Sequence, residues 1–478
     1  MRLPAFSKSK EFKASVVFVF ASVCSQGIAL ISLPVFTRIL STEQMGVVTM
    51  YNTWLNLIGM ITTLGLTSGS FNIAMMQFGD KRAQYTSSAL TLSLVVSVPL
   101  FVLSFPFGDF FSALLGLSVP LIHCMCAMLV LSPAINLWLM RQRYEYRYIS
   151  VFVITVINSV IGTLFAIVAV VTATMLGITE LPEVRLFASS AVSALIAFAV
   201  GAFIFIKGKT FFNKCYWVFA LRTGFPLIVH SVAKYILDAS DKILIGIFVG
   251  SAAVGIYGVL YSISSISLVF WSAINSALIP FIFERLKVDE GERVRSVATP
   301  LLVSYLIICL LLMLFAPEVV GLLATESYEE AVYLVPPIAS GIFFTSLYNL
   351  YSNLILFKGR TVFVMLATVV AATVNIGLNI IFLPIFGYIA AAYTTLVSCS
   401  LLALMQYLFS KKLKISYVLN NRFNLLLSII VIVTGIAINL LYPIQPLIRY
   451  SIILAILIMI IVFRKKIIYA YHQAKTRE

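Results

Sequence analysis

Runs of about 20 mostly apolar residues recur along the whole chain, and they constrain its fold more than any other feature of the sequence. A helix of that length crosses the roughly 30 Å hydrocarbon core of a bilayer. Because lipid offers no hydrogen-bond partners, only helices and closed barrels can span it. Barrel strands alternate apolar and polar residues, whereas the segment from Leu301 to Phe315 is apolar on every side. The sequence therefore predicts an all-α integral membrane protein.

The composition excludes a soluble globular protein. Apolar side chains make up 61% of the 478 residues and charged ones only 11%, whereas soluble domains carry about 25% charged residues. Charged residues and Pro or Gly clusters interrupt the apolar runs and delimit about 14 transmembrane helices. These predicted spans cover 14–36, 45–67, 87–106, 117–139, 149–172, 186–206 and 223–241 in the first half, then 252–278, 299–316, 333–356, 361–383, 388–409, 424–441 and 447–463.

The distribution of Lys and Arg predicts the orientation of the spans. Cytoplasmic loops are enriched in these residues, and all but five of the 33 basic residues fall at the termini or in alternate loops. We therefore expect a multi-pass protein of the cytoplasmic membrane with both termini in the cytoplasm. The net charge of +15 is spread over these segments, which favours membrane lipids rather than nucleic acid as the partner. The five exceptions are Arg38, Arg185, Lys234, Lys242 and Arg449.

No catalytic residue, metal ligand or cofactor is predicted. Residues 208–210 (GKT) resemble the end of a phosphate-binding loop, but Phe203 stands where its first glycine belongs. His123, Cys124 and Cys126 are metal-ligand types, yet they lie inside one apolar helix that points the two thiols in different directions. The predicted exported loops are too short for a folded catalytic segment. The sequence therefore predicts a transporter and not an enzyme.

A weak internal repeat predicts the domain organisation. The segment from Arg38 to Tyr51 matches the segment from Ile247 to Leu260 at an offset of 209 residues, with Gly46 aligned to Gly255. Chance similarity between short membrane loops is the alternative explanation. Transporters are commonly built from such repeats. The match predicts an N-terminal lobe of six helices, a second six-helix lobe, and two further helices with a basic tail. The corresponding ranges are 1–212, 213–415 and 416–478.

The seventh predicted span carries an unusual set of polar side chains. His230, Lys234, Asp238 and Asp241 recur at spacings that place them on one helix face. With Arg222 at the cytoplasmic boundary, Lys234 lies about 18 Å along the helix axis, near the bilayer midplane. A charge at that depth costs about 2.5 to 3.5 kcal/mol, so it should face water, a counter-ion or a ligand. The stripe is therefore a candidate binding surface.

Alternative interpretations of these charges remain open. Lys234 and Asp238 could form a purely structural ion pair that touches no substrate. Arg38 and Lys242 lie at the predicted exported mouth of the protein, where a cation either guides an anionic group or anchors the end of a helix. The anchoring interpretation is favoured for Arg38 and Lys242.

Three stretches of the sequence resemble a known family. They are LPVFTRILSTEQMGVVTMYNTW (Leu33 to Trp54), FPLIVHSVAKYILDASDKILIGIFVGSAAVGIYGVLY (Phe225 to Tyr261) and FLPIFGYIAAAYTTLVS (Phe382 to Ser398). They are similar to the Wzx-type O-antigen and polysaccharide flippases of the multidrug/oligosaccharidyl-lipid/polysaccharide exporter superfamily, and the similarity extends over nearly the whole chain. The matching residues serve turns or close packing: Pro34, Gly46, Gly255, Tyr257, Gly387 and Ala390 to Ala392.

The resemblance implies a V-shaped pair of lobes that works by alternating access. The implied substrate is an undecaprenyl-pyrophosphate-linked oligosaccharide repeat unit, and polysaccharide polymerases or assembly proteins are the implied partners. On this basis we hypothesise that Lys234 attracts the pyrophosphate or an acidic sugar and that Asp238 neutralises it when the cavity is empty. Whether a proton or sodium gradient drives transport stays open.

Two other function classes remain open. A cation-coupled multidrug antiporter of the same superfamily would use buried carboxylates such as Asp238 and Asp241. A polytopic polysaccharide polymerase or ligase is less favoured, because it would carry a large exported loop.

Overall fold

The computed structural model describes residues 10–66, 70–444 and 446–458. Its regular structure is helical throughout these residues and includes no strand. Within the same ranges, eleven helices are long and apolar enough to cross a membrane, and two shorter apolar helices cover Ser251–Ser264 and Pro446–Ile458. The predicted all-α membrane fold is therefore confirmed.

The six spans predicted before residue 212 coincide with long helices. Local sequence explains where the helix at Thr42 begins: the Ser41 hydroxyl accepts a hydrogen bond from the Gln44 backbone N–H, and the Gln44 side chain accepts one from the Ser41 N–H. Short helices α3 (Ser70–Gln77) and α5 (Gly108–Leu115) were not predicted. The long helices are α1 (Lys10–Ile39), α2 (Thr42–Thr62), α4 (Arg82–Ser104), α6 (Val119–Tyr144), α7 (Tyr148–Met175) and α8 (Leu181–Gly208).

Beyond residue 212 the helices differ from the predicted spans most at α9 and at 252–278, and the helix predicted at 299 begins at Gly291. Helix α9 begins at Lys214 rather than 223, because the Asn213 side chain accepts hydrogen bonds from two backbone N–H groups and caps the helix early. The predicted span 252–278 consists of two helices that meet at Ser265. These elements are α9 (Lys214–Phe248), α10 (Ser251–Ser264), α11 (Ile266–Lys287), α12 (Gly291–Leu314), α13 (Ala316–Leu323), α14 (Val335–Phe357), α15 (Thr361–Phe386), α16 (Ile389–Lys412) and α17 (Asn421–Leu441).

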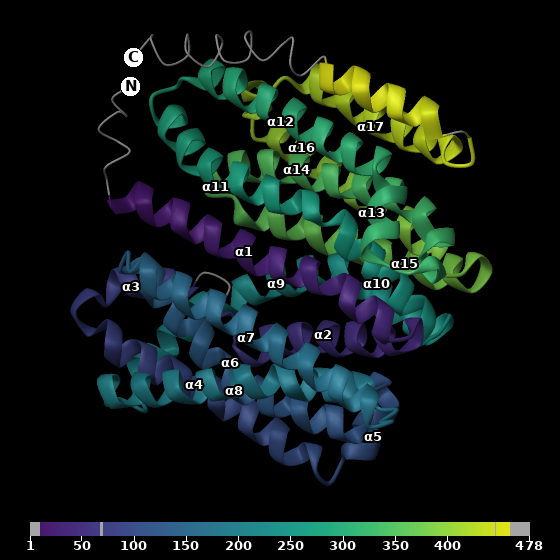
Figure 1. The fold of residues 1–478 in the computed structure, drawn as a ribbon. Helices are drawn as coiled ribbons and strands as arrows, with labels where there is room; N and C mark the ends of the chain where they lie inside the picture. Colours follow the sequence, from purple (N-terminus) through teal and green to yellow (C-terminus); the bar gives the residue numbers. More distant parts are fainter. Residues whose placement is uncertain (1–9, 67–69, 445, 459–478) are drawn as a thin grey trace.

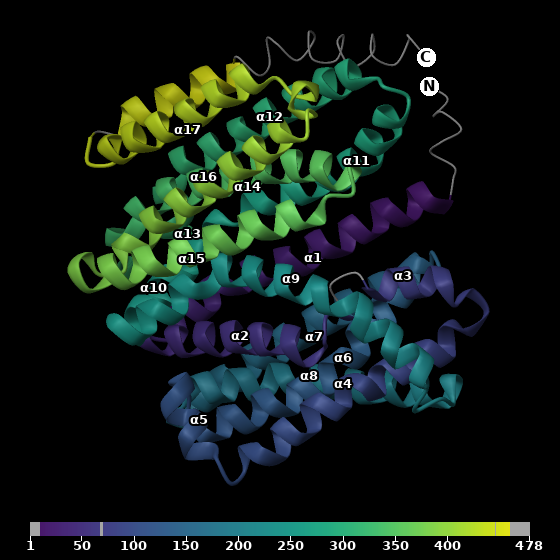
Figure 2. The same ribbon diagram turned by 180° about the vertical axis from the view of Figure 1, so that it is seen from behind.

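The helices form two groups that lie on either side of α1 and α9. In Figure 1, α2 to α8 lie below and α10 to α17 lie above, and the reverse view in Figure 2 shows the same division. Helix α1 packs on α7, while α9 packs on α15 from one group and on α2 from the other. The lobe boundaries at residues 212 and 415 stay a prediction. The last predicted span is described only as far as residue 458, and the basic tail lies outside the described residues.

The two groups meet where α2 crosses α10. A Cβ atom added to Gly46 would lie 1.9 Å from the Ser251 carbonyl oxygen, and one added to Gly255 would lie 1.9 Å from the Thr42 carbonyl oxygen. Thr42 and Ser251 are themselves separated by the repeat offset of 209 residues. Each repeat therefore presents its glycine to the same position of the other repeat, which is the contact expected at a two-fold axis between equivalent units. This reciprocity supports the internal repeat.

Candidate functional site

Helix α9 carries an ion pair close to its middle. The Lys234 Nζ atom donates to both Asp238 carboxylate oxygens, with a distance of 2.6 Å to Oδ2. The Lys234 side chain is 22% exposed and the Asp238 side chain 38% exposed, so the pair is reachable from outside the protein interior. Lys234 lies three residues from the centre of the 35-residue helix. The structural pairing that the sequence left open is therefore present.

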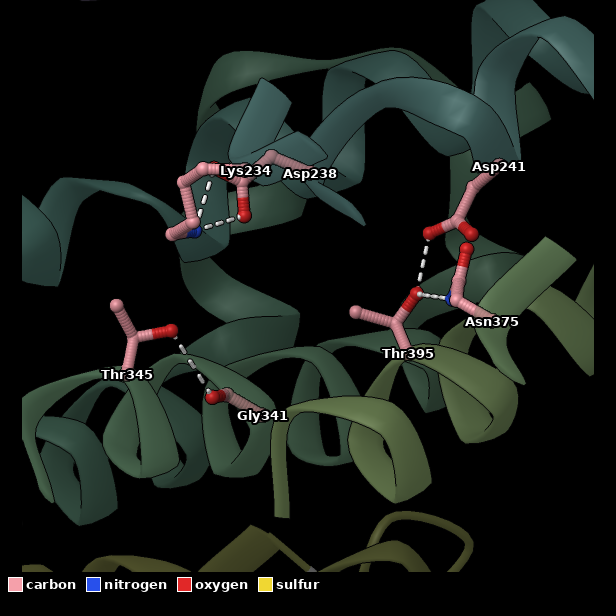
Figure 3. Close-up of polar contacts among 7 residues, drawn as sticks. All are labelled: Lys234, Asp238, Asp241, Gly341, Thr345, Asn375 and Thr395. Atoms are coloured by element: carbon pink, nitrogen blue, oxygen red, sulfur yellow. Dashed lines mark hydrogen bonds and ion pairs between the residues drawn. The ribbon is translucent and has the colours of Figure 1, made fainter. Parts of the chain in front are cut away.

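Asp241 occupies a different environment on the same helix. Its side chain is completely buried and accepts hydrogen bonds from the Tyr257 hydroxyl at 2.7 Å, from Asn379 Nδ2 at 2.7 Å and from the Thr395 hydroxyl. Figure 3 shows Asp241 projecting from α9 toward Thr395, on the same side as the Lys234–Asp238 pair. The carboxylate thus links α9 to α10, α15 and α16.

Neutral polar side chains hydrogen-bond to one another around this carboxylate. The Ser240 hydroxyl donates to Asn375 Oδ1 at 2.7 Å, and Asn375 Nδ2 donates to the Thr395 hydroxyl at 3.3 Å. The Thr394 hydroxyl donates to Asn379 Oδ1 at 2.5 Å. Among the described residues, no Lys, Arg or His side chain forms an ion pair with Asp241. A buried carboxylate without an ion-pair partner is costly, and the hydrogen bonds that Asp241 accepts offset part of that cost.

The remaining predicted residues lie outside these two groups. His230 Nδ1 is buried and has no hydrogen-bond partner among the described residues. Arg38 donates to the Pro34 carbonyl at 3.0 Å and to the Leu322 carbonyl at 3.3 Å, which ties the end of α1 to α13. The Lys242 ammonium lies 4.4 Å from the centre of the Tyr261 ring. The contacts of Arg38 and Lys242 are consistent with the anchoring interpretation, which stays a prediction.

A cavity of about 310 Å³ lies between the two groups of helices. Side chains of α1, α2 and α8 line it on one side and side chains of α10 and α11 on the other. Its lining includes the polar residues Gln26, Asn52 and Ser262 as well as Arg185, one of the five basic residues outside the predicted cytoplasmic segments. The cavity therefore has contributions from both repeats, as a central transport site would.

A family profile described as "Polysaccharide biosynthesis protein" matches residues 12–286, which is more than half of the chain. The chain belongs to this family. In this member of the polysaccharide biosynthesis family, a second profile, MatE, matches residues 226–381 and includes most of the Asp241 network.

Several known proteins resemble this chain over most of its length. The "Probable low-salt glycan biosynthesis flippase Agl15" of Haloferax volcanii is 21% identical over 410 residues, which are 81% of this chain and 80% of the relative. The lipid II flippase MurJ in an inward closed conformation matches with a TM-score of 0.67 and 17% identity, covering 95% of this chain and 100% of that structure. An inward-facing multidrug resistance MATE transporter matches with a TM-score of 0.61 and 14% identity, and the match covers 84% of this chain and 98% of that structure. The predicted superfamily is therefore confirmed.

Sequence reasoning missed most of the residues around Asp241 in this polysaccharide biosynthesis family protein. Asn375 and Asn379 lie four residues apart in the otherwise apolar α15, so they share one face of that helix. Thr394 and Thr395 begin the second turn of α16. These two amides could have revealed the site in the sequence, because polar groups inside a membrane-spanning helix need polar partners.

Proposed function

We propose that this protein is a flippase that moves an undecaprenyl-pyrophosphate-linked oligosaccharide across the bacterial cytoplasmic membrane. The observation that carries the proposal is the Lys234–Asp238 pair, a partly buried cation near the middle of a spanning helix in a member of the polysaccharide biosynthesis family. The substrate is the repeat unit of O-antigen or of a related surface polysaccharide. Both termini lie in the cytoplasm, and polysaccharide polymerases or assembly proteins are the partners that receive the product.

In this proposal, Asp238 holds the Lys234 ammonium while no substrate is bound. A pyrophosphate that enters the protein exchanges with the carboxylate as the partner of the cation. The exchange conserves the charge balance near the midplane, where an unpaired ammonium would cost about 2.5 to 3.5 kcal/mol. The partial exposure of both side chains is consistent with such an exchange.

Lys234→Ala tests the role of this cation. We expect it to abolish surface polysaccharide at equal protein level, whereas Lys234→Arg retains it because Arg keeps the charge. The readout is the amount of surface polysaccharide relative to the amount of protein in the membrane. A fully active Lys234→Ala variant would remove Lys234 from the mechanism.

We propose further that an ion gradient drives the cycle through Asp241. Its buried carboxylate and the hydroxyl oxygens of Tyr257 and Thr395 are hard oxygen ligands of the kind that suit a sodium ion. The same carboxylate is able to bind a proton instead. Either ion would neutralise a buried charge that lacks a cationic partner among the described residues.

Depletion of the protein in its host tests the function itself. Extracted polyprenyl lipids are identified by mass spectrometry before and after depletion, alongside the amount of surface polysaccharide. We expect a complete single repeat unit on undecaprenyl pyrophosphate to accumulate while the surface polysaccharide disappears. The mass of that lipid would also give the sugar composition of the substrate.

A cation-coupled multidrug or small-molecule antiporter is the second candidate. The buried Asp241 and the MatE match over residues 226–381 favour it, since a transporter coupled to an ion needs such a carboxylate. Unchanged lipids and surface polysaccharide on depletion, together with increased drug sensitivity, would favour the antiporter. Accumulation of transported but unpolymerised repeat units would point instead to a polymerase or ligase.

A further inference from the structure

Arg185 is the one charged side chain among the residues that line the described cavity between the two groups of helices. It lies in the first turns of α8, four residues after the helix begins. Met45 and Asn52 of α2 line the same cavity, and Ser262 and Ser265 from the α10 and α11 side face them. A cation in this position is surrounded by polar and apolar neutral groups from both repeats.

The contacts of Arg185 leave most of its hydrogen-bonding capacity free. Its Nη1 atom donates to the Met45 sulfur at 3.2 Å, which is a weak acceptor, and its Cζ atom lies 3.7 Å from the centre of the Phe36 ring. None of the described carboxylates forms an ion pair with it. A guanidinium has five N–H donors in a planar fork. Phe36 therefore supports one face of the fork, and donors remain for a ligand in the cavity.

The other cations that the sequence places in exported loops or within the membrane are already engaged. Lys234 pairs with Asp238, and Arg449 pairs with Glu318. Arg38 donates to two carbonyl groups and Lys242 lies over an aromatic ring. Arg185 differs from all four in two ways. It lines a cavity, and it has no anionic or carbonyl partner within the described chain. A positive charge in that situation favours an anion from outside the protein.

Arg185 also lies next to the contact that joins the two repeats. Met45, its hydrogen-bond partner, directly precedes Gly46 at the crossing of α2 and α10. The crossing therefore adjoins the exported end of the cavity, given the predicted orientation with both termini in the cytoplasm. An anion bound to Arg185 would lie beside this crossing.

We propose that Arg185 is an oxyanion-binding subsite at the exported end of the cavity and that it binds the pyrophosphate of the lipid-linked glycan. The subsite is distinct from Lys234, which is not among the residues that line the cavity. Its planar fork binds two oxygens of one phosphate group, which fits pyrophosphate better than a point charge would. This inference rests on the proposed flippase function for the source of the anion, although binding of the anion itself does not.

Anion binding to the purified full chain in detergent tests the subsite directly. Inorganic pyrophosphate is titrated at low ionic strength, and binding is followed by the thermal shift of the protein. We expect Arg185→Gln to weaken binding about tenfold or more, while Arg185→Lys retains part of it because the charge remains. Arg38→Gln is the matched control: it removes the same charge near the exported end outside the cavity, so it should bind as the wild type does.

The outcomes separate the subsite from the flippase proposal. Binding by Arg185→Gln within twofold of the wild type would overturn the subsite, even if depletion of the protein still causes the repeat unit to accumulate. Loss of binding in Arg185→Gln would support the subsite even if depletion left the lipids unchanged. Glucuronate is titrated in parallel, and Arg185-dependent binding of glucuronate without pyrophosphate would overturn the assignment to phosphate. Size-exclusion chromatography of each variant shows that the compared proteins are folded.

Discussion

Lys234 and Asp241 project from the same side of α9, but their surroundings give the two charges different properties. Lys234 is part of an ion pair whose members are 22% and 38% exposed. Asp241 is fully buried and receives hydrogen bonds from residues of three other helices. A partly exposed pair can exchange partners, whereas a buried carboxylate with fixed donors has room only for a proton or a small ion. At the scale of single residues, we therefore expect anion binding at Lys234 and ion coupling at Asp241.

Asp241→Asn tests the coupling role. Asparagine has nearly the same shape as aspartate, but it cannot bind a proton at neutral pH and it attracts sodium only weakly. We expect flipping in proteoliposomes to lose its dependence on pH or sodium, with a fall of about tenfold or more in the gradient-driven rate. The measurement compares rates with and without each gradient.

Asp109→Asn provides the control for this experiment. Asp109 is an exposed residue of the short helix α5, so the same chemical change there should leave gradient dependence intact. A folded Asp241→Asn variant that responds to both gradients like the wild type would show that Asp241 is a structural residue.

At the scale of elements, the crossing of α2 and α10 depends on two glycines. The Gly46 and Gly255 positions each face a backbone carbonyl oxygen of the other helix at a distance that excludes any side chain. Interiors are close-packed, and a methyl group that meets a backbone oxygen can be accommodated only if one helix moves. Because the crossing lies between the two repeats, such a movement separates them on the exported side.

Gly46→Ala is therefore expected to shift the protein toward an outward-open state. The readout is labelling of a single cysteine placed at the cavity residue Ser262, in a background without the six native cysteines. A membrane-impermeant maleimide added from the exported side should react several times faster in the Gly46→Ala variant. Gly255→Ala should behave in the same way because its contact is the reciprocal one.

Gly321→Ala is the matched control, since an added Cβ atom there meets no neighbour within 4 Å. It should label at the wild-type rate. Equal labelling of the Gly46→Ala variant and this control would mean that the crossing does not seal the cavity.

At the scale of the whole molecule, the order of the spans determines which ends of the helices face each side of the membrane. The Lys and Arg residues of alternate loops predict which side is cytoplasmic. Reporter fusions test this orientation. Fusions at Phe107, Glu326 and Pro443 should give an exported signal, and fusions at Arg143, Lys287 and Lys411 a cytoplasmic one. An exported signal at Lys411 would contradict the predicted helix count.

Much of the fold could be predicted because each span is encoded locally. A membrane helix satisfies its own backbone hydrogen bonds, so a long apolar run is sufficient to specify it. The break at Ser265 and the early start of α9 escaped prediction, since they depend on a turn inside an apolar run and on a cap supplied by Asn213. The internal repeat was visible in the sequence through Gly46 and Gly255.

The sequence by itself determined the class of protein, its helical spans and the stripe of charges on one face of α9, because these follow from composition and from helical periodicity. Only the tertiary structure decided which partners these charges meet. The donors to Asp241 come from positions 257, 379 and 395, and Arg185 reaches the cavity from a helix whose sequence carries no other sign of it. The physical reason is that polar groups in a membrane are satisfied by neighbouring helices, and their packing brings together residues that are far apart in the chain.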